Sequence, residues 1–185
     1  MLFRSVPSIG MRLWSEERRL GTIELLLTMP VTISQAILGK FLASWLFIAI
    51  ALALTFPLII TVNVLGDPDN GVIAAGYVGS LLLGGAYLSL ACMTSAITRN
   101  QVISFILALI LSLALILVGF EPITAMLGRW ASPGVIESVA SFSVLTHFDG
   151  FQKGVLDTRD LLYFLSVIGF ALFTTGVIVR NRRAG

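Results

Sequence analysis

Charged residues are scarce in this chain of 185 residues: they make up 12% of it, whereas hydrophobic residues make up 57%. A typical soluble domain has about 25% charged and roughly 45–50% apolar residues. So few charges leave too little polar surface to cover a soluble globule, which indicates that lipid is the solvent for much of the surface. The net charge of +2 is too small to indicate a nucleic-acid partner.

Cysteine and histidine are almost absent, with one residue of each type, Cys92 and His147. A single cysteine excludes a disulfide within the chain and any cysteine-based metal site. We expect Cys92 to be a small packing residue and His147 to be an ordinary hydrogen-bonding side chain. The phosphate-binding pattern Gly-x-x-x-x-Gly-Lys is not met before Lys40, because Ser34 stands where the earlier glycine belongs. The sequence therefore predicts no catalytic site, no metal and no cofactor.

Four long stretches carry no charge, at residues 41–66, 71–98, 100–120 and 161–179. A helix needs about 20 apolar residues to cross a hydrocarbon core of about 30 Å, and a helix satisfies its own backbone hydrogen bonds in lipid. The predicted fold class is an all-α integral membrane protein with about four transmembrane helices, a cytoplasmic amphipathic elbow and short outer interfacial helices.

The chain is predicted to be a single membrane domain over residues 1–185. Residues 1–37 form its N-terminal segment and the cytoplasmic elbow. The transmembrane helices are expected at 38–66, 71–98, 101–120 and 161–180. Residues 121–160 are expected to form an outer loop with short helices, because apolar patches alternate there with breakers such as Pro133 and Gly134.

Lysine and arginine are unevenly divided between the two sides of these spans. Nine of the twelve lie on the side that holds both ends of the chain, and the other three are Arg129, Lys153 and Arg159. Basic residues favour the cytoplasmic side of a membrane. We therefore expect a multi-pass protein of the inner (plasma) membrane with both termini in the cytoplasm.

Residues 12–40 carry the most informative pattern. Gly21 can end one helical turn, Thr22 can cap the next, and Pro30 stops that piece. A capping box at 32–35 starts a fresh helix that runs into the first span, with Lys40 snorkelling at the inner interface. The local chemistry thus predicts a helical elbow on the cytoplasmic side.

The elbow also carries a family likeness. Residues 16–31 read Glu-Glu-Arg-Arg-Leu-Gly-Thr-Ile-Glu-Leu-Leu-Leu-Thr-Met-Pro-Val, and Gly39-Lys40 follow. This pattern resembles permease subunits of type-2 ABC exporters, above all the gliding-motility-associated subgroup, to which residues 146–157 are also similar. The resemblance implies that the elbow contacts a separate ABC ATPase subunit. The implied contact residues are Glu16, Glu17, Arg18, Arg19, Gly21, Thr22, Glu24, Leu26 and Leu27.

The resemblance also implies a function and its partners. The chain would be a non-enzymatic permease subunit, pairing with a second copy or a homologous permease among membrane lipids to form the route through the membrane. Such permeases usually have six spans, and residues 2–11 would match only the tail of the second, so we expect the first span and most of the second to be absent. A non-transporting membrane scaffold is the alternative, and a secondary carrier is disfavoured because no span holds a central charge.

Small and polar side chains within the spans are explained by helix packing and by hydrogen bonds within or between helices. Gly76, Ser80 and Gly84 fall at four-residue spacing, which predicts close helix packing within the subunit or across a dimer. The isolated polar residues of the spans are Asn63, Thr94, Ser95, Ser104 and Ser112. We expect these to hydrogen-bond to a neighbouring helix or to their own backbone rather than to line a path.

Overall fold

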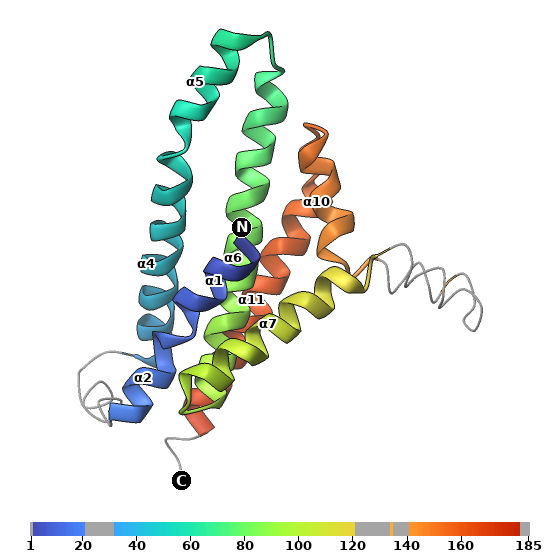
Figure 1. Cartoon of the computed structure of the whole chain (residues 1–185). Helices are drawn as coiled ribbons and strands as arrows, with labels where there is room; N and C mark the ends of the chain where they lie inside the picture. Colours follow the sequence, from blue (N-terminus) through green and yellow to red (C-terminus); the bar gives the residue numbers. More distant parts are fainter. Residues whose placement is uncertain (1, 21–31, 121–133, 135–140, 182–185) are drawn as a thin grey trace.

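The computed structural model describes residues 2–20, 32–120, 134 and 141–181 (Figure 1). Within these ranges the chain is helical and contains no strand, which confirms the all-α prediction. The helices are α1 (Leu2–Gly10), α2 (Arg12–Leu20), α4 (Ile33–Ala53), α5 (Phe56–Leu65), α6 (Asn70–Ile97), α7 (Gln101–Leu117), α10 (Val144–Gln152) and α11 (Thr158–Asn181).

Three helical segments of the described chain are long and apolar enough to cross a membrane. They are Ile33–Leu65, which combines α4 and α5, Asn70–Ile97 and Thr158–Asn181. The fourth apolar helix, α7, has 17 residues, which is shorter than the span expected at 101–120 and below the usual crossing length of about 20 residues. The chain is therefore a multi-pass membrane protein, whose described residues include three long apolar helical segments and one shorter apolar helix.

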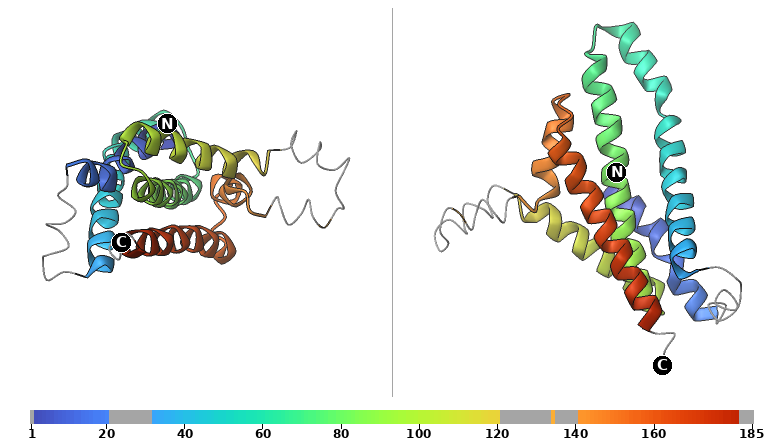
Figure 2. Two further views of the ribbon diagram at one scale, coloured as in Figure 1. Left: turned by 90° about the horizontal axis from the view of Figure 1, so that it is seen from below. Right: turned by 180° about the vertical axis from the view of Figure 1, so that it is seen from behind.

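The helix α6 forms the centre of the bundle, and α1, α4, α7, α10 and α11 all pack against it (Figure 2). Its glycines allow close approach. A Cβ atom at Gly85 would lie 2.9 Å from Trp45 Nε1 of α4 and 3.1 Å from Ile168 Cδ1 of α11. Small residues promote helix association in lipid because they let backbones come near each other. The central helix is therefore in close contact with both α4 and α11.

The first span is interrupted between α4 and α5. Pro57 has no backbone N–H to donate and its ring obstructs a continuous helix, so α4 ends at Ala53 and α5 begins at Phe56. The Thr55 hydroxyl donates to the carbonyl of Leu52 at 2.6 Å, and it also bonds to the Tyr77 hydroxyl of α6 at 2.5 Å. These bonds fasten the break to the central helix.

Local capping signals define where two of the long helices begin. The capping box at 32–35 is confirmed: the Thr32 hydroxyl accepts from the Gln35 N–H at 3.3 Å, and the Gln35 side chain accepts from the Thr32 N–H at 3.0 Å. The carboxylate of Asp157 accepts from the Arg159 N–H at 3.0 Å at the start of α11. The side chains of Thr32 and Asp157 thus accept from backbone N–H groups that have no partner within their own helix.

The two ends of the bundle differ in charge. At one end lie α2, the start of α4, the turn between α6 and α7, and the end of α11 (Figure 1). We call this the basic end, because it holds Arg12, Lys40, Arg99 and Arg180. The opposite ends of α5 and α6 meet at a turn that contains Asp67 and Asp69. Within the predicted outer loop the structure describes α10, while residues 121–133 and 135–140 lie outside the described residues.

Candidate functional site

The part of the elbow that the structure describes is α2, at the basic end of the bundle. One side of α2 is buried, and there Trp14 is only 1% exposed and Ser15 is fully buried. Its other side remains accessible: Glu16 is half-buried, Arg19 is exposed, and Leu20 is 63% exposed, whereas the half-buried Glu17 forms an ion pair with Lys40 of α4. The helix is thus held to the bundle along one face and presents charge along the other.

A serine of the central helix holds the start of α2. The Ser95 hydroxyl oxygen accepts hydrogen bonds from the backbone N–H groups of Trp14 and Ser15, each at 2.9 Å. The same hydroxyl donates to the carbonyl of Met11 at 3.0 Å. The first N–H groups of a helix lack acceptors within it, so Ser95 caps α2 from a position about 80 residues away in sequence. The expectation that Ser95 bonds to a neighbouring helix is confirmed.

The side chain of Lys40 joins α4 to α2. Its ammonium forms an ion pair with the Glu17 carboxylate, donates to the carbonyl of Leu13 at 2.9 Å, and lies 4.2 Å from the centroid of the Trp14 ring. The Lys40 and Glu17 side chains are 20% and 28% exposed, so solvent only partly screens their attraction. Lys40 was expected to snorkel at the inner interface, and the structure shows in addition that its ammonium bonds to these partners within the protein.

The indole of Trp14 is the apolar centre of this region. It forms one cluster with Ile37 of α4, Cys92 and Ala96 of α6, and Val179 of α11. Residues of four helices therefore meet in this cluster, since Trp14 itself belongs to α2. A large aromatic ring buries more surface than any aliphatic side chain, so a displacement of α2 must shift or open this cluster.

The residues predicted for the ATPase contact divide into two groups. The structure describes Glu16, Glu17 and Arg19 on α2, and it places Arg18 on the same helix. The other five lie outside the described residues: Gly21, Thr22, Glu24, Leu26 and Leu27. Sequence reasoning did not single out Trp14 and Ser15, although a tryptophan two positions before the charged run at 16–19 was the available signal.

The three small residues predicted for helix packing lie on α6 in different surroundings. A Cβ atom at Gly84 would lie 3.2 Å from Ile48 Cγ2 of α4, whereas no heavy atom lies within 4 Å of that position at Gly76. Ser80 is half-buried. Tight approach to α6 is also found at Gly79, where a Cβ atom would lie 2.7 Å from the Phe151 side chain of α10.

The remaining polar residues of the spans divide into bonded and unbonded side chains. Asn63 donates to the carbonyl of Ile59 at 2.9 Å, and Thr94 donates to that of Ala91 at 3.0 Å, as expected. The buried hydroxyls of Ser104 and Ser112 on α7 have no hydrogen-bond partner among the described residues, contrary to expectation. They alternate with the buried Ala108 at four-residue spacing, so small size explains their position better than polarity.

A second polar cluster lies where α10 meets α11. His147 Nδ1 lies 2.7 Å from Asp160 Oδ1, and its Nε2 lies 2.9 Å from the carbonyl oxygen of Ser141. The ring of Tyr163 stacks on the imidazole with 4.0 Å between centroids. Both ring nitrogens of His147 therefore have partners, in agreement with a hydrogen-bonding role. Over the described ranges no group of three His, Cys, Asp or Glu side chains is placed to hold a metal ion.

Comparison with known proteins adds one finding to this geometry. Residues 8–172 match the family model described as ABC-2 family transporter protein. The matched range contains α2, the Ser95 and Lys40 contacts, and most of α11. No curated protein matches the sequence significantly.

Proposed function

Because the chain belongs to the ABC-2 family of transporter membrane proteins, we propose that it is the permease subunit of an ATP-driven exporter and that its elbow contacts a separate ATPase subunit. Proteins of this family are typically the non-catalytic membrane component of the transporter. In the proposed mechanism, ATP binding favours one arrangement of two permease halves and hydrolysis releases it. The elbow passes the motion of the ATPase to the spans.

One observation supports this role for α2 more than any other: the helix is fastened to the spans on one side and accessible on the other. Ser95 caps its start from α6, and Lys40 holds Glu17 and Leu13 from α4. A partner that moves the exposed face of α2 would therefore move α4 and α6 with it. Contiguous packed contacts with discrete arrangements are what physical coupling between distant sites requires.

The proposed contact includes charged and apolar parts. Glu16, Glu17, Arg18 and Arg19 would make polar contacts at its rim, while Leu26 and Leu27 would fill a groove of the partner, as an amphipathic helix does. Gly21, Thr22 and Glu24 would shape the turn between the two parts. The cytoplasmic location of both termini and membership of the gliding-motility-associated subgroup are parts of the same proposal.

Charge reversal on the exposed face of α2 tests this proposal. The chain is co-expressed with candidate ABC ATPases of the same organism, and the complex is purified in detergent. We expect Glu16→Lys combined with Arg19→Glu to weaken the complex at least about tenfold, because the substitutions place like charges opposite each other. The matched control is Arg159→Glu, which reverses an exposed charge in the first turn of α11.

The outcomes separate the permease from the scaffold alternative. Loss of the complex together with loss of ATP-dependent export supports the permease. An unchanged complex with the α2 variant, or equal loss with the control, contradicts the elbow contact. A complex that is lost while ATP-dependent export from inverted vesicles persists would also contradict the proposal, because the ATPase would then act elsewhere.

A further inference from the structure

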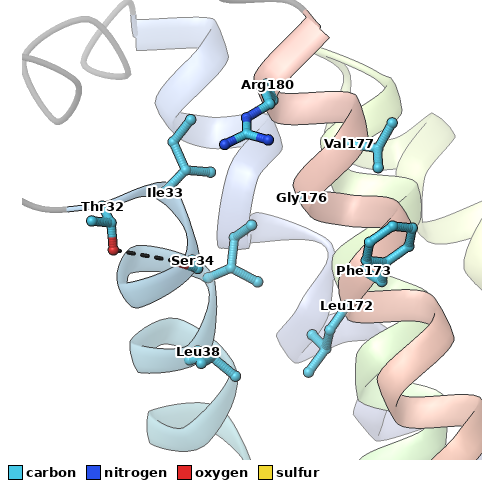
Figure 3. A pocket seen from close by; sticks show the side chains of 10 residues that line it. Thr32, Ile33, Ser34, Leu38, Leu172, Phe173, Gly176, Val177 and Arg180 are labelled. Carbon is cyan, nitrogen blue, oxygen red and sulfur yellow. Dashed lines mark hydrogen bonds between the residues drawn. The ribbon is translucent and has the colours of Figure 1, made fainter.

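A groove with a volume of about 820 Å³ lies between the start of α4 and the end of α11 (Figure 3). Most of its lining is apolar and includes Ile33 and Leu38 of α4 and Leu172 and Phe173 of α11. Leu38 is 48% exposed and Phe173 is 73% exposed, so the groove opens toward the surroundings of the bundle. No described residue that lines it is acidic, and its one charged residue is Arg180.

The guanidinium of Arg180 lies on the side of α11 that faces α4, at the mouth of the groove (Figure 3). Ion pairs among the described residues join Lys40 to Glu17, His147 to Asp160, and Lys153 to Asp149. None of them involves Arg180. A guanidinium has five donors arranged to bind the oxygens of a phosphate, so this side chain can accept an anion from outside the described chain.

The start of α4 adds positive potential at the same place. Thr32 and Ser34 line the groove, and they belong to the cap and the first turn of α4. A helix N-terminus carries a partial positive charge that favours anions. The mouth of the groove is thus electropositive on both sides, while the rest of the groove is apolar.

This combination points to one class of ligand. We infer that the groove binds an anionic phospholipid, with its phosphate against Arg180 and an acyl chain along Leu38, Leu172 and Phe173. A free phosphate ion would leave the apolar lining without a contact. A phospholipid matches both the positively charged mouth and the apolar lining of the groove. The inference rests on the orientation in the proposed function, which places the basic end in the cytoplasmic leaflet, where anionic lipids are enriched.

Lipid retention by the purified full-length chain tests the charged part of the site. The protein in detergent is mixed with equal amounts of phosphatidylglycerol and phosphatidylcholine, and native mass spectrometry measures which lipid stays bound. Wild type should prefer phosphatidylglycerol, and Arg180→Gln should lower that preference about fivefold, as expected for one basic residue at an anionic surface. The matched control is Arg99→Gln, an exposed arginine at the same end of the bundle, which should keep the wild-type preference.

Filling the groove tests its apolar part. A Cβ atom at Gly176 would lie 3.7 Å from Ile37 Cδ1, whereas nothing lies within 4 Å of that position at Gly169. Gly176→Phe should therefore place a ring in the groove and lower the retention of both lipids. Gly169→Phe adds the same ring to α11 outside the groove, and retention should match that of wild type.

Three results would overturn the inference. The first is that Arg180→Gln keeps the wild-type preference. The second is that Gly176→Phe retains lipid as well as Gly169→Phe does. The third is that glycerol 3-phosphate displaces phosphatidylglycerol, which would identify the ligand as a soluble phosphate. No ATPase is present in this assay. The lipid assay can therefore be interpreted even if α2 does not contact an ATPase. A negative result in the lipid assay likewise does not contradict the proposed contact with the ATPase.

Discussion

Two polar clusters hold helices together in this bundle, and they differ in how far along the chain their partners lie. Where α10 meets α11, His147 bonds to Asp160, which is 13 residues away. At the basic end, Ser95 bonds to the backbone of Trp14, which is 81 residues away, and Lys40 reaches the carbonyl of Leu13 across 27 residues. The first cluster is local, whereas the second joins elements that are remote in sequence.

The two clusters also differ in what they leave exposed. The side chain of His147 is 9% exposed and has protein partners at both ring nitrogens. The cluster at the basic end includes the buried Trp14 and Ser95, yet it carries the charged outer face of α2 on its surface. The closed local cluster fastens α10 to the neighbouring helix α11. A long-range cluster with an accessible face can transmit force from a partner, and this contrast is the reason to place coupling at the basic end.

The largest loss of stability is expected from Trp14→Ala in the cluster at the basic end. The substitution removes a ring that is 1% exposed where α2, α4, α6 and α11 meet, and it should lower the free energy of unfolding by about 3–5 kcal/mol. Denaturant unfolding in detergent micelles measures the change. Leu20→Ala on the exposed face is the control and should stay within about 0.5 kcal/mol of wild type. Equal losses for the two variants would mean that α2 is not anchored as described.

A smaller effect is expected from His147→Ala in the local cluster. The carboxylate of Asp160 and the carbonyl of Ser141 each lose a bonded partner, which should cost about 1–3 kcal/mol of unfolding free energy. Hydrogen exchange should quicken in α10, while α2 stays protected and the ATPase complex is unchanged. Faster exchange in α2 would show that the two clusters are not independent.

The smallest change in stability is expected for the Lys40–Glu17 pair. Lys40→Met and Glu17→Gln should each lower the unfolding free energy by no more than about 1 kcal/mol, because the ion pair is partly solvated. Each should nevertheless reduce ATP-driven export, since the pair links α2 to α4. A double-mutant cycle on transport checks the point. Additive losses would contradict a direct link between these two side chains.

The long helices could be predicted from the sequence because a lipid environment excludes charged residues from the spans. Stretches free of charge mark spans, and the capping box at 32–35 marks where α4 begins. The break at Pro57 follows from its missing N–H, although a hydropathy argument treats that stretch as one span. The shorter α7 was harder to foresee, because the apolar run continues to Phe120 while the helix ends at Leu117.

The candidate site was only partly predictable for a physical reason. Its charged run at 16–19 is visible in the sequence, because exposed charges are rare in this chain. The Ser95 cap could not be located, since one hydroxyl in a span looks like any other until the fold brings it to the start of α2. The partners of Lys40 depend on the same long-range packing. Local signals thus indicate the exposed face of the elbow, and the tertiary structure supplies its anchor.

The exposed face of α2 is proposed to contact an ATPase subunit, and crosslinking from that face can detect the contact. A photoreactive phenylalanine derivative is placed at Leu20, which is 63% exposed, or at Val155, which is 57% exposed between α10 and α11. The complex is then irradiated in membranes with and without ATP. We expect a crosslink to the ATPase subunit from position 20 alone, with a yield that changes on ATP addition. A crosslink from position 155, or none from position 20 while the complex is intact, would contradict it.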